Sequence, residues 1–441
     1  MNIILLSGGS GKRLWPLSNE TNSKQFLRLL RSDKGEKESM VQRVFRQIKE
    51  TGIDANIVIA TGRSQVESIN SQLGDVDIVV EPERRNTYPA ILLASAYLKY
   101  KKNVDLNDSV LVLPVDPYAE NTYFETLVKM DKAILEGTSD LTLMGIKPTY
   151  PSEKYGYIIC EEIKNDIKKV IKFKEKPTLN EAKELLNKGA YWNAGVFGFK
   201  LGYLMNILEK EIKVSSFEEL SERFNDLTSN SFDYEVVEKA KSINMISYNG
   251  EWKDLGTWNT LTEEMPDSHG NVVMGENNRN VSVINVTDKP VVVLGLEDAI
   301  VAVSTEGVLV SNKEKSSYLK PYVENINERP LFERKRWGEY RVIDQTQTED
   351  GINTLTKHIT VNKGKSISLQ KHFIRDEVWS IIDGEGEITV DDKIWIVKRG
   401  DTVKISKEQK HKITAITDLQ LIEIQIGKEL IEEDIERFDY E

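Results

Sequence analysis

The chain has 441 residues, of which 39% are hydrophobic and 29% are charged, and its net charge is −12. This length exceeds what one hydrophobic core usually holds, so two or three domains of a soluble globular protein are expected. The negative charge argues against a general nucleic-acid surface and against anionic membranes, but it does not exclude nucleotides. The single cysteine, Cys160, excludes internal disulfides and thiolate metal clusters. With no long apolar span and no signal-like N-terminus, a cytoplasmic location is expected.

The first predicted element is a buried strand, because Ile3–Leu6 is an uninterrupted apolar run. The loop that follows it carries three glycines and two cations, namely Gly8, Gly9, Gly11, Lys12 and Arg13. Glycines let a backbone approach an anionic group closely, and cations neutralise the charge of that group. The spacing excludes a Walker A loop, which would need a glycine at Leu6, and the dinucleotide fingerprint, which would need one at Leu14. With Lys24 a short way on, the loop resembles the signature of sugar-1-phosphate nucleotidylyltransferases.

Apolar runs alternate with helical patterns as far as about residue 145. The predicted strands are Ile3–Leu6, Ile57–Ala60, Asp77–Val80, Val110–Pro114 and Leu141–Gly145. The amphipathic stretches between them include Ser39–Lys49, Pro89–Tyr100 and Tyr123–Glu136. This alternation predicts βαβ units and a mainly parallel, Rossmann-like α/β sheet that is covered by helices. Loops at the carboxyl ends of such strands carry function, and both the glycine-rich loop and Asp116 fall there.

The pattern of predicted helices and strands changes twice after this region. Mixed helical and strand patterns continue to about residue 265, so the first domain is predicted over 1–265. Short β runs separated by turn residues then predict a small β-rich connector over 266–325, of a left-handed β-helix type, with a helix near Ser316–Asn325. Beyond a linker at 325–330, residues 331–441 read as strands throughout. Their turns fall at Gly364, Asp383-Gly384, Asp391-Asp392 and Arg399-Gly400, which predicts an all-β barrel.

Two aspartates are candidate metal ligands. Asp116 ends the run VLVLPVD, and Asp254 lies within WKDLGTW. Attack of a sugar-1-phosphate oxygen on the α-phosphate of a nucleoside triphosphate needs in-line positioning and charge neutralisation more than a protein nucleophile. Mg²⁺ is usually held by one or two carboxylates together with phosphate oxygens, so these two residues suffice.

A longer resemblance covers about the first 325 residues. Blocks in family order resemble bacterial mannose-1-phosphate guanylyltransferases, also called GDP-mannose pyrophosphorylases: LLSGGSGKRLWPLS, EPERRNTYPAI, LVLPVD, MGIKPTYPSEKYGYI, FKEKP, WNAGVFGF, DYEVVEK and WKDLGTW. Two positions depart from the family pattern: Ser23 stands where proline is usual, and Pro117 where histidine is usual. Neither departure removes a charged group.

The resemblance implies a role for each matching residue. It places the triphosphate at the first loop, against Ser7, Gly8, Gly9, Gly11, Lys12, Arg13 and Lys24. It places guanine and ribose near Glu81, Asn86 and Thr87, and Mg²⁺ on Asp116 and Asp254. The sugar and its phosphate are implied to contact Gly145, Tyr157, Glu175, Lys176 and Asn193. Arg13, Lys24 and Lys176 are the implied catalytic cations.

Residues 331–441 resemble the cupin domain of type II mannose-6-phosphate isomerases. The family pattern Gln-x-His-x-His-Arg-x-Glu-His-Trp corresponds here to QKHFIRDEVW at 370–379. His372, Glu377 and a downstream His411 remain as ligands for a divalent metal, while Ile374 and Val378 replace two histidines. Aldose–ketose isomerisation needs a metal or a base, so we expect no isomerase activity. The basic residues Lys371 and Arg375 are expected to be open to an anionic ligand.

Three functions remain in competition. The first is a Mg²⁺-dependent enzyme of polysaccharide biosynthesis that converts GTP and mannose 1-phosphate into GDP-mannose and pyrophosphate, and we favour it. The second is a bifunctional enzyme that also interconverts mannose 6-phosphate and fructose 6-phosphate, against which the two replaced histidines argue. The third is a non-catalytic nucleotide-sugar sensor, against which the retention of every charged residue of the transfer site argues. A homo-oligomer, with a dimer favoured, is expected.

Overall fold

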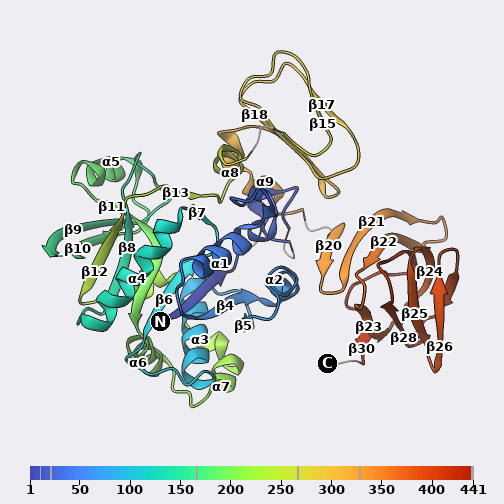
Figure 1. The fold of residues 1–441 in the computed structure, drawn as a ribbon, viewed down its shortest axis with the longest axis horizontal. Coiled ribbons are helices and arrows are strands. Elements are labelled where there is room, and N and C mark those ends of the chain that lie inside the picture. Colours follow the sequence, from blue (N-terminus) through green and yellow to red (C-terminus); the bar gives the residue numbers. More distant parts are fainter. Residues whose placement is uncertain (10, 20–21, 165–166, 266–267, 327–328, 439–441) are drawn as a thin grey trace. The chain divides into compact units, whose positions relative to one another are not determined.

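The computed structural model describes residues 1–9, 11–19, 22–164, 167–265, 268–326 and 329–438. By packing, the chain divides into two compact units (Figure 1), Met1–Ala302 with Leu309–Val323 and Val303–Val308 with Glu324–Glu441. The predicted domain boundaries fall on residues that lie outside the described ones, namely 266–267 and 327–328. The same is true of the last three residues of the predicted third domain, 439–441. The division into 1–265, 266–325 and 331–441 therefore stays a prediction. Among the described residues, no helix is apolar over a length that would cross a bilayer.

One large sheet organises the first unit. Nine described strands lie in the order β5-β4-β1-β6-β11-β8-β12-β10-β9. Their bounds are β1 Asn2–Ser7, β4 Asn56–Gly62, β5 Asp77–Glu81, β6 Ser109–Pro114, β8 Leu141–Ile146, β9 Tyr157–Lys164, β10 Ile167–Lys174, β11 Tyr191–Lys200 and β12 Ile243–Tyr248. The strand β1 pairs in parallel with β4 and β6, and β4 with β5. These strands are apolar throughout because helices cover both faces of the sheet.

Helices lie on both faces of this sheet (Figure 1). Their bounds are α1 Met40–Glu50, α2 Val66–Leu73, α3 Thr87–Tyr100, α4 Asn121–Glu136, α5 Leu179–Asn187, α6 Leu201–Glu211 and α7 Phe217–Glu222. The helix α8, Trp258–Glu263, packs instead in a core shared with the connector. Side chains of β1 alternate between two cores: Ile4 packs with α3 and α6, while Ile3 and Leu5 pack with α1 and α4. Successive side chains of a strand point to opposite faces of the sheet, so one apolar strand contributes side chains to both cores.

The second half of the sheet departs from parallel order at β11. This strand is antiparallel to both of its neighbours, β6 and β8, whereas β8 and β12 are parallel. The register of β11 against β8 shifts between Asn193 and Phe197, where Gly195 has a φ of +69°. A shift of this kind re-aims side chains. Here it lies beside the cavity described below.

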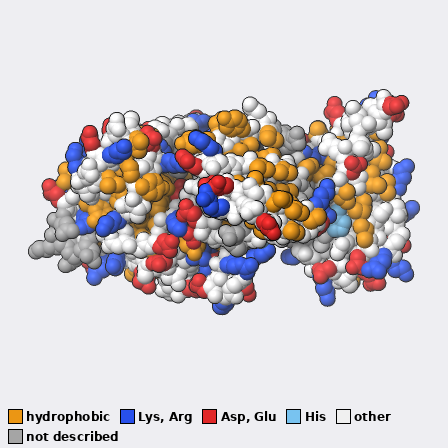
Figure 2. Space-filling model, turned by 90° about the horizontal axis from the view of Figure 1, so that it is seen from above, with side chains coloured by type: hydrophobic (Ala, Val, Ile, Leu, Met, Phe, Trp, Pro, Cys, Tyr) orange, Lys and Arg blue, Asp and Glu red, His pale blue; other side chains and the backbone are white. Residues whose placement is uncertain are grey.

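The connector consists of short strands with parallel neighbours. Its elements are β14 Ser268–His269, β15 Val272–Met274, β16 Ser282–Asn285, β17 Val291–Val293, β18 Ala299–Ser304, β19 Gly307–Asn312 and α9 Lys320–Val323. The strand β14 pairs in parallel with β16, and β15 with β17, as in a solenoid. Ile284, Ile300 and Ala302 share one core with Trp258 and Leu14, so the connector packs against the α/β part of the first unit. Its outer side is apolar and exposed, and Figure 2 shows hydrophobic side chains gathered on the surface turned to the viewer.

The second unit is an antiparallel β structure built from two sheets of described strands. One sheet has the order β20-β21-β22-β29-β24-β27 and the other β26-β25-β28-β23-β30. Their bounds are β20 Phe332–Lys335, β21 Gly338–Gln347, β22 Asn353–Val361, β23 Ser366–Lys371, β24 Arg375–Asp383, β25 Glu385–Val390, β26 Lys393–Lys398, β27 Thr402–Ile405, β28 His411–Ala415, β29 Leu419–Gly427 and β30 Glu436–Arg437. An apolar core that includes Leu355, Trp379 and Ile413 lies between the sheets. The turns predicted at Gly364, Gly384 and Gly400 all separate strands.

Candidate active site

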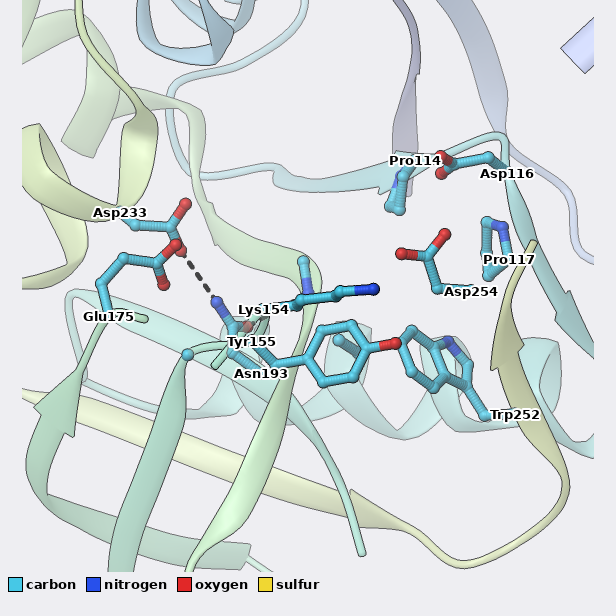
Figure 3. A pocket seen from close by; sticks show the side chains of 13 residues that line it. Pro114, Asp116, Pro117, Lys154, Tyr155, Glu175, Asn193, Asp233, Trp252 and Asp254 are labelled. Carbon is cyan, nitrogen blue, oxygen red and sulfur yellow. Dashed lines mark hydrogen bonds between the residues drawn. The ribbon is translucent and has the colours of Figure 1, made fainter. Parts of the chain in front are cut away.

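A cavity of about 190 Å³ opens at the carboxyl edge of the first unit's sheet. Four carboxylates line it, and we call it the acidic pocket: Asp116, Glu175, Asp233 and Asp254. Figure 3 shows these side chains as two pairs at opposite ends of the cavity, with Lys154, Tyr155 and Asn193 between them. The two pairs of carboxylates are positioned by different elements of the fold, and each end of the cavity is described in turn.

Asp116 and Asp254 lie at one end because two short strands pair there. Asp116 follows β6, and the next residues form β7 (Pro117–Ala119). The strand β13 (Trp252–Asp254) pairs antiparallel with β7, and its register places Asp254 opposite Pro117. This pairing joins residues that are far apart in the sequence, so both carboxylates reach the same end of the pocket (Figure 3).

Two cations act on this carboxylate pair. Lys24 Nζ lies 2.5 Å from Asp116 Oδ2. Burial raises the pKa of Asp116, but the charge and hydrogen bond of Lys24, with a smaller effect of Arg13, outweigh burial, so its pKa is held below the usual range. Asp254 has its pKa raised by burial and by the charge of Asp116, against the opposing charge of Lys24. Two carboxylates side by side are the hard oxygen ligands that a divalent cation prefers, so these residues fit a metal.

The other end of the pocket is lined by two of the predicted sugar residues, Glu175 and Asn193. Lys176 Nζ lies 2.8 Å from Glu175 Oε1, and Asn193 Nδ2 donates to Asp233 Oδ1 at 2.8 Å. The Glu175 side chain is 6% exposed and that of Lys176 57%, so the pair points its ammonium outward. Burial, reinforced by the charge of Glu175, raises the pKa of Asp233 to about 7.

The backbone at this end has two uncommon conformations. Lys176 has a φ of +40°, which a side chain with a Cβ rarely adopts, and a π-helix spans Asp233–Val237. Both features recur at functional sites because the surrounding structure must hold them in place. Gly156 contributes a third constraint, since a Cβ there would come within 2.5 Å of Glu175 Oε2.

Three predicted sugar residues do not line the cavity directly, namely Lys176, Tyr157 and Gly145. Tyr157 is fully buried, and its hydroxyl accepts a hydrogen bond from Ser152 N at 2.8 Å. Gly145 lies in β8 opposite Asn193, and a Cβ there would collide with Met245 Sδ. In the structure Tyr157 and Gly145 support the strands behind the pocket. Contact of any of the three with a sugar stays a prediction.

A second cavity, of about 360 Å³, lies over the glycine-rich loop, and we call it the loop pocket. It brings together most of the predicted nucleotide residues: Gly8, Gly9, Lys24, Glu81, Asn86 and Thr87. Pro114 and Asp116 line both pockets, so the two cavities adjoin at the end of β6. Adjoining sites for two substrates are what a group transfer between them needs.

The other loop residues shape the loop pocket without lining it. Gly11 has a φ of +66°, and a Cβ there would collide with Asn19 O. Ser7 O accepts a hydrogen bond from Thr61 Oγ1 at 2.9 Å, which fixes the end of β1. In the 3₁₀ helix Lys12–Leu14, Lys12 is half-buried and Arg13 is exposed.

At the far wall of the loop pocket, Glu81 ends β5 and α3 begins nearby. Burial raises the pKa of Glu81 to about 7, although Arg84 acts against it. Asn86 has a φ of +75°, and its side chain accepts from Thr87 N at 2.9 Å. Thr87 Oγ1 in turn accepts from Phe232 N at 2.9 Å, next to Asp233. One short hydrogen-bonded path thus joins the walls of the two pockets.

The sequence analysis missed several lining residues, and four of them are charged or aromatic side chains inside quoted motifs: Lys154, Asp233, Trp252 and Arg84. All four fall inside the family-like blocks MGIKPTYPSEKYGYI, DYEVVEK, WKDLGTW and EPERRNTYPAI. The blocks were therefore a usable signal. A block does not show, however, which of its side chains face a cavity.

The second unit contains the predicted cupin ligands in one place. Donor atoms of His372, Glu377 and His411 all lie within 4.8 Å of one another. Burial, then the charge of Arg375, lowers the pKa of His372 to about 4. Arg375, expected to be open to an anion, is instead 5% exposed and hydrogen-bonded to Glu377 Oε1 at 3.0 Å. Lys371 Nζ lies 2.8 Å from Glu436 Oε2.

Comparisons with known proteins bear on both units. The family model described as nucleotidyl transferase matches residues 2–270, and the one described as mannose-6-phosphate isomerase C-terminal matches residues 327–440. A mannose-1-phosphate guanylyltransferase of Salmonella montevideo is 32% identical, with 99% of this chain and 98% of that protein covered. The alginate biosynthesis protein AlgA of Pseudomonas putida is 30% identical, with 99% and 95% covered.

A solved structure agrees with these relatives. The crystal structure described as mannose-1-phosphate geranyltransferase from Thermus thermophilus is 27% identical, with a TM-score of 0.61, and the match covers 74% of this chain and 99% of that one. The fold is that of a nucleotidyltransferase, and the chain belongs to the nucleotidyl transferase family, in its full-length mannose-1-phosphate guanylyltransferase branch. The predicted fold class is confirmed.

Proposed function

We propose that this enzyme forms GDP-mannose and pyrophosphate from GTP and mannose 1-phosphate, with the triphosphate in the loop pocket and the sugar phosphate in the acidic pocket. The observation that carries this proposal is the sharing of Pro114 and Asp116 by both cavities. A phosphate oxygen of the sugar can there meet the α-phosphorus of the nucleotide. Relatives over the full length carry the same activity in their names.

In the proposed reaction, an oxygen of the mannose 1-phosphate attacks the α-phosphorus of GTP. The bond from that phosphorus to the bridging oxygen breaks, and pyrophosphate leaves from the opposite side. Lys24 and Arg13 would neutralise the charge that moves onto the leaving group, because both act on the carboxylates at this position. Asp116 and Asp254 would hold Mg²⁺, which supplies further charge neutralisation on the phosphates.

The opposite end of the acidic pocket would bind the sugar. Carboxylates of Glu175 and Asp233 accept hydrogen bonds from hydroxyl groups, and Asn193 offers both a donor and an acceptor. The outward-pointing Lys176 ammonium would meet the phosphate as a point charge. These four groups support a hexose 1-phosphate as the acceptor substrate.

In the loop pocket we propose that Glu81 reads the base. An ionised carboxylate can accept hydrogen bonds from N1 and N2 of guanine together, and adenine offers no such pair of donors. Its raised pKa reflects burial, and a buried acceptor is the kind of group that discriminates between bases. Asn86 and Thr87 lie beside it at the start of α3, near the proposed position of the ribose.

The substrate assignment can be tested directly. Purified protein is offered each of GTP, ATP, UTP, CTP and dTTP with mannose 1-phosphate or glucose 1-phosphate, and pyrophosphate release is measured with Mg²⁺ present. We expect the GTP and mannose 1-phosphate pair to have the highest kcat/KM. Equal rates with another nucleotide would overturn the base assignment, and no pyrophosphate from any pair would favour the sensor.

A second activity was left open by the sequence, because the second unit matches an isomerase domain. We propose that this unit does not isomerise hexose phosphates. Ile374 and Val378 stand where the family pattern has imidazoles, and neither aliphatic side chain coordinates a metal or carries a proton.

We also propose a cytoplasmic location and a homo-oligomer, with a dimer favoured. Support for an oligomer comes from exposed apolar side chains on the connector, among them Val292, Leu294 and Val310. Light scattering coupled to size exclusion measures the mass in solution. A mass of one chain across the micromolar range would overturn the oligomer.

A further inference from the structure

The acidic pocket by itself has the wrong charge for an anionic substrate. Four carboxylates line it, whereas a phosphate monoester brings a further charge of about −1.5 to −2 at neutral pH. Like charges at close range repel strongly in a cavity that excludes part of the solvent. A sugar phosphate can therefore bind there only where cations offset both the carboxylates and the phosphate group.

The lysines described so far are already paired with carboxylates. Lys24 contacts Asp116, and Lys176 contacts Glu175. Neither of these two lysines lines the acidic pocket. The proposed Mg²⁺ would offset Asp116 and Asp254, at one end of the cavity only. The middle of the cavity therefore requires a further cation if a phosphate is to lie there.

Lys154 is the one lysine or arginine among the described residues that line this cavity. Its backbone belongs to a turn before β9, in which Lys154 N donates to Ser152 Oγ at 3.1 Å. Ser152 N donates in turn to the hydroxyl of the fully buried Tyr157 at 2.8 Å. The neighbouring Tyr155 packs edge to face against Trp252, with ring centroids 5.6 Å apart. Because the residues on both sides are fixed, Lys154 is held at the wall of the pocket.

The side chain of Lys154 extends across the cavity (Figure 3). Its nitrogen points toward Asp254 and away from Glu175 and Asp233. Within the described part of the chain, the ammonium forms no ion pair, although four carboxylates line the same cavity. A lysine is a compact charge on a flexible stem, so it can follow a phosphate oxygen. The ammonium is therefore available to an anion that enters between the two pairs of carboxylates.

We propose that Lys154 binds the phosphate of the acceptor sugar and so restricts the acidic pocket to phosphorylated sugars. This role rests on the proposed function, in which the sugar hydroxyls bind Glu175 and Asp233 and the reacting oxygen lies near Asp116. The phosphate then lies between these two ends, on the side to which the ammonium points. Lys154 forms and breaks no covalent bond. Its charge holds the phosphate oxygens that do not react, so the remaining oxygen faces the α-phosphorus.

Steady-state kinetics of the full chain separate this role from a structural one. Lys154→Met keeps the length of the side chain and removes its charge, and Lys183→Met, at an exposed position of α5, is the matched control. We expect Lys154→Met to raise the KM for mannose 1-phosphate about tenfold to a hundredfold, as the loss of a charged hydrogen bond does, and to leave the KM for GTP within about twofold. Lys154→Arg retains the charge and should recover most of the affinity. Lys183→Met should behave as the wild type does.

Binding measured without turnover makes the test independent of the proposed reaction. Calorimetry with mannose 1-phosphate is performed with Mg²⁺ and a GTP analogue that has a methylene group between the α- and β-phosphorus and so cannot release pyrophosphate. Weaker binding to Lys154→Met by about tenfold or more supports the role of Lys154. It does so even if the wild type releases no pyrophosphate from GTP, a result that would overturn the proposed function alone.

Two other outcomes would count against Lys154. Equal affinities of the wild type and Lys154→Met for mannose 1-phosphate, or a rise in the KM for GTP instead, would overturn its role and leave the proposed function intact. A wild type that binds no mannose 1-phosphate would overturn both.

Discussion

At the scale of single residues, the charges at the shared end of the two pockets carry most of the proposed chemistry. Lys24, Asp116 and Asp254 come from three separate parts of the sequence, and Lys24 contacts Asp116 directly. The sequence predicted all three as site residues, through the motifs in which they stand. Their contact with substrates stays a prediction. The sequence did not predict that Lys24 would pair with Asp116, because that contact joins residues from different parts of the chain.

We expect Asp116→Asn and Asp254→Asn to lower kcat by about a hundredfold or more, because each removes charge that organises the phosphates and the metal. Neither side chain supports the apolar core, so the thermal midpoint should change little. Pyrophosphate release and differential scanning fluorimetry measure the two quantities. Asp105→Asn, at an exposed turn, is the matched control for loss of one carboxylate. A near-normal rate in either site variant at ordinary Mg²⁺ would contradict the assignment.

The raised pKa of Glu81 predicts a pH dependence of GTP binding. Only the ionised carboxylate accepts from both guanine nitrogens, so affinity is full above the pKa of about 7 and is lost as the pH falls below it. Between pH 8 and pH 6 the dissociation constant should rise about tenfold from this group.

Calorimetric titration with GTP at several pH values measures this dependence, with Glu81→Gln as the comparison. Protonation of the triphosphate is common to both proteins, so only the difference between them reports Glu81. We expect Glu81→Gln to bind more weakly at pH 8 and to show the shallower dependence. Identical curves for the two proteins would exclude Glu81 from base recognition.

At the scale of elements, the sequence predicts features that depend on local residue pattern, but it does not predict which distant strands pair. The buried strand β1, the glycine-rich loop and the turns of the second unit follow from local composition, and the structure has them where they were predicted. The antiparallel β11 and the pairing of β7 with β13 depend on residues far apart in the chain. Asp233 was missed for the same reason, because its place in the acidic pocket beside Asn193 joins residues far apart in the chain.

Gly156, at the entry to β9, should be intolerant of a side chain. A Cβ there would come within 2.5 Å of Glu175 Oε2 and 2.9 Å of the Phe173 ring, so Gly156→Ala must displace Glu175. We expect the KM for mannose 1-phosphate to rise several-fold, while the KM for GTP changes little because the loop pocket is untouched. The KM for GTP, measured on the same variant, is the internal control. Equal changes in both KM values would indicate a general loss of structure.

At the scale of the whole molecule, two units with separate family matches share one chain. Relatives match over 99% of this chain, so the second unit is a regular part of the family. We expect the full-length protein to convert no mannose 6-phosphate into fructose 6-phosphate with Zn²⁺, Mn²⁺ or Co²⁺ added. Product is measured by a coupled enzymatic assay, with an active isomerase as positive control. Metal-dependent turnover that disappears in His411→Gln would contradict this expectation.

The contact of Lys24 with Asp116 has a consequence for the order in which the substrates arrive. The Lys24 ammonium serves as counterion to the Asp116 carboxylate, so a divalent cation that arrives without phosphates must compete with it. Incoming phosphates offer Lys24 another anion and so release Asp116. We expect Mg²⁺ and GTP to enter together as one complex, with Mg²⁺ alone binding at least about tenfold more weakly than Mg²⁺ with nucleotide present. Titration of Mn²⁺ followed by electron paramagnetic resonance measures the metal affinity without and with nucleotide. Equal affinities would show that Lys24 does not compete with the metal for Asp116.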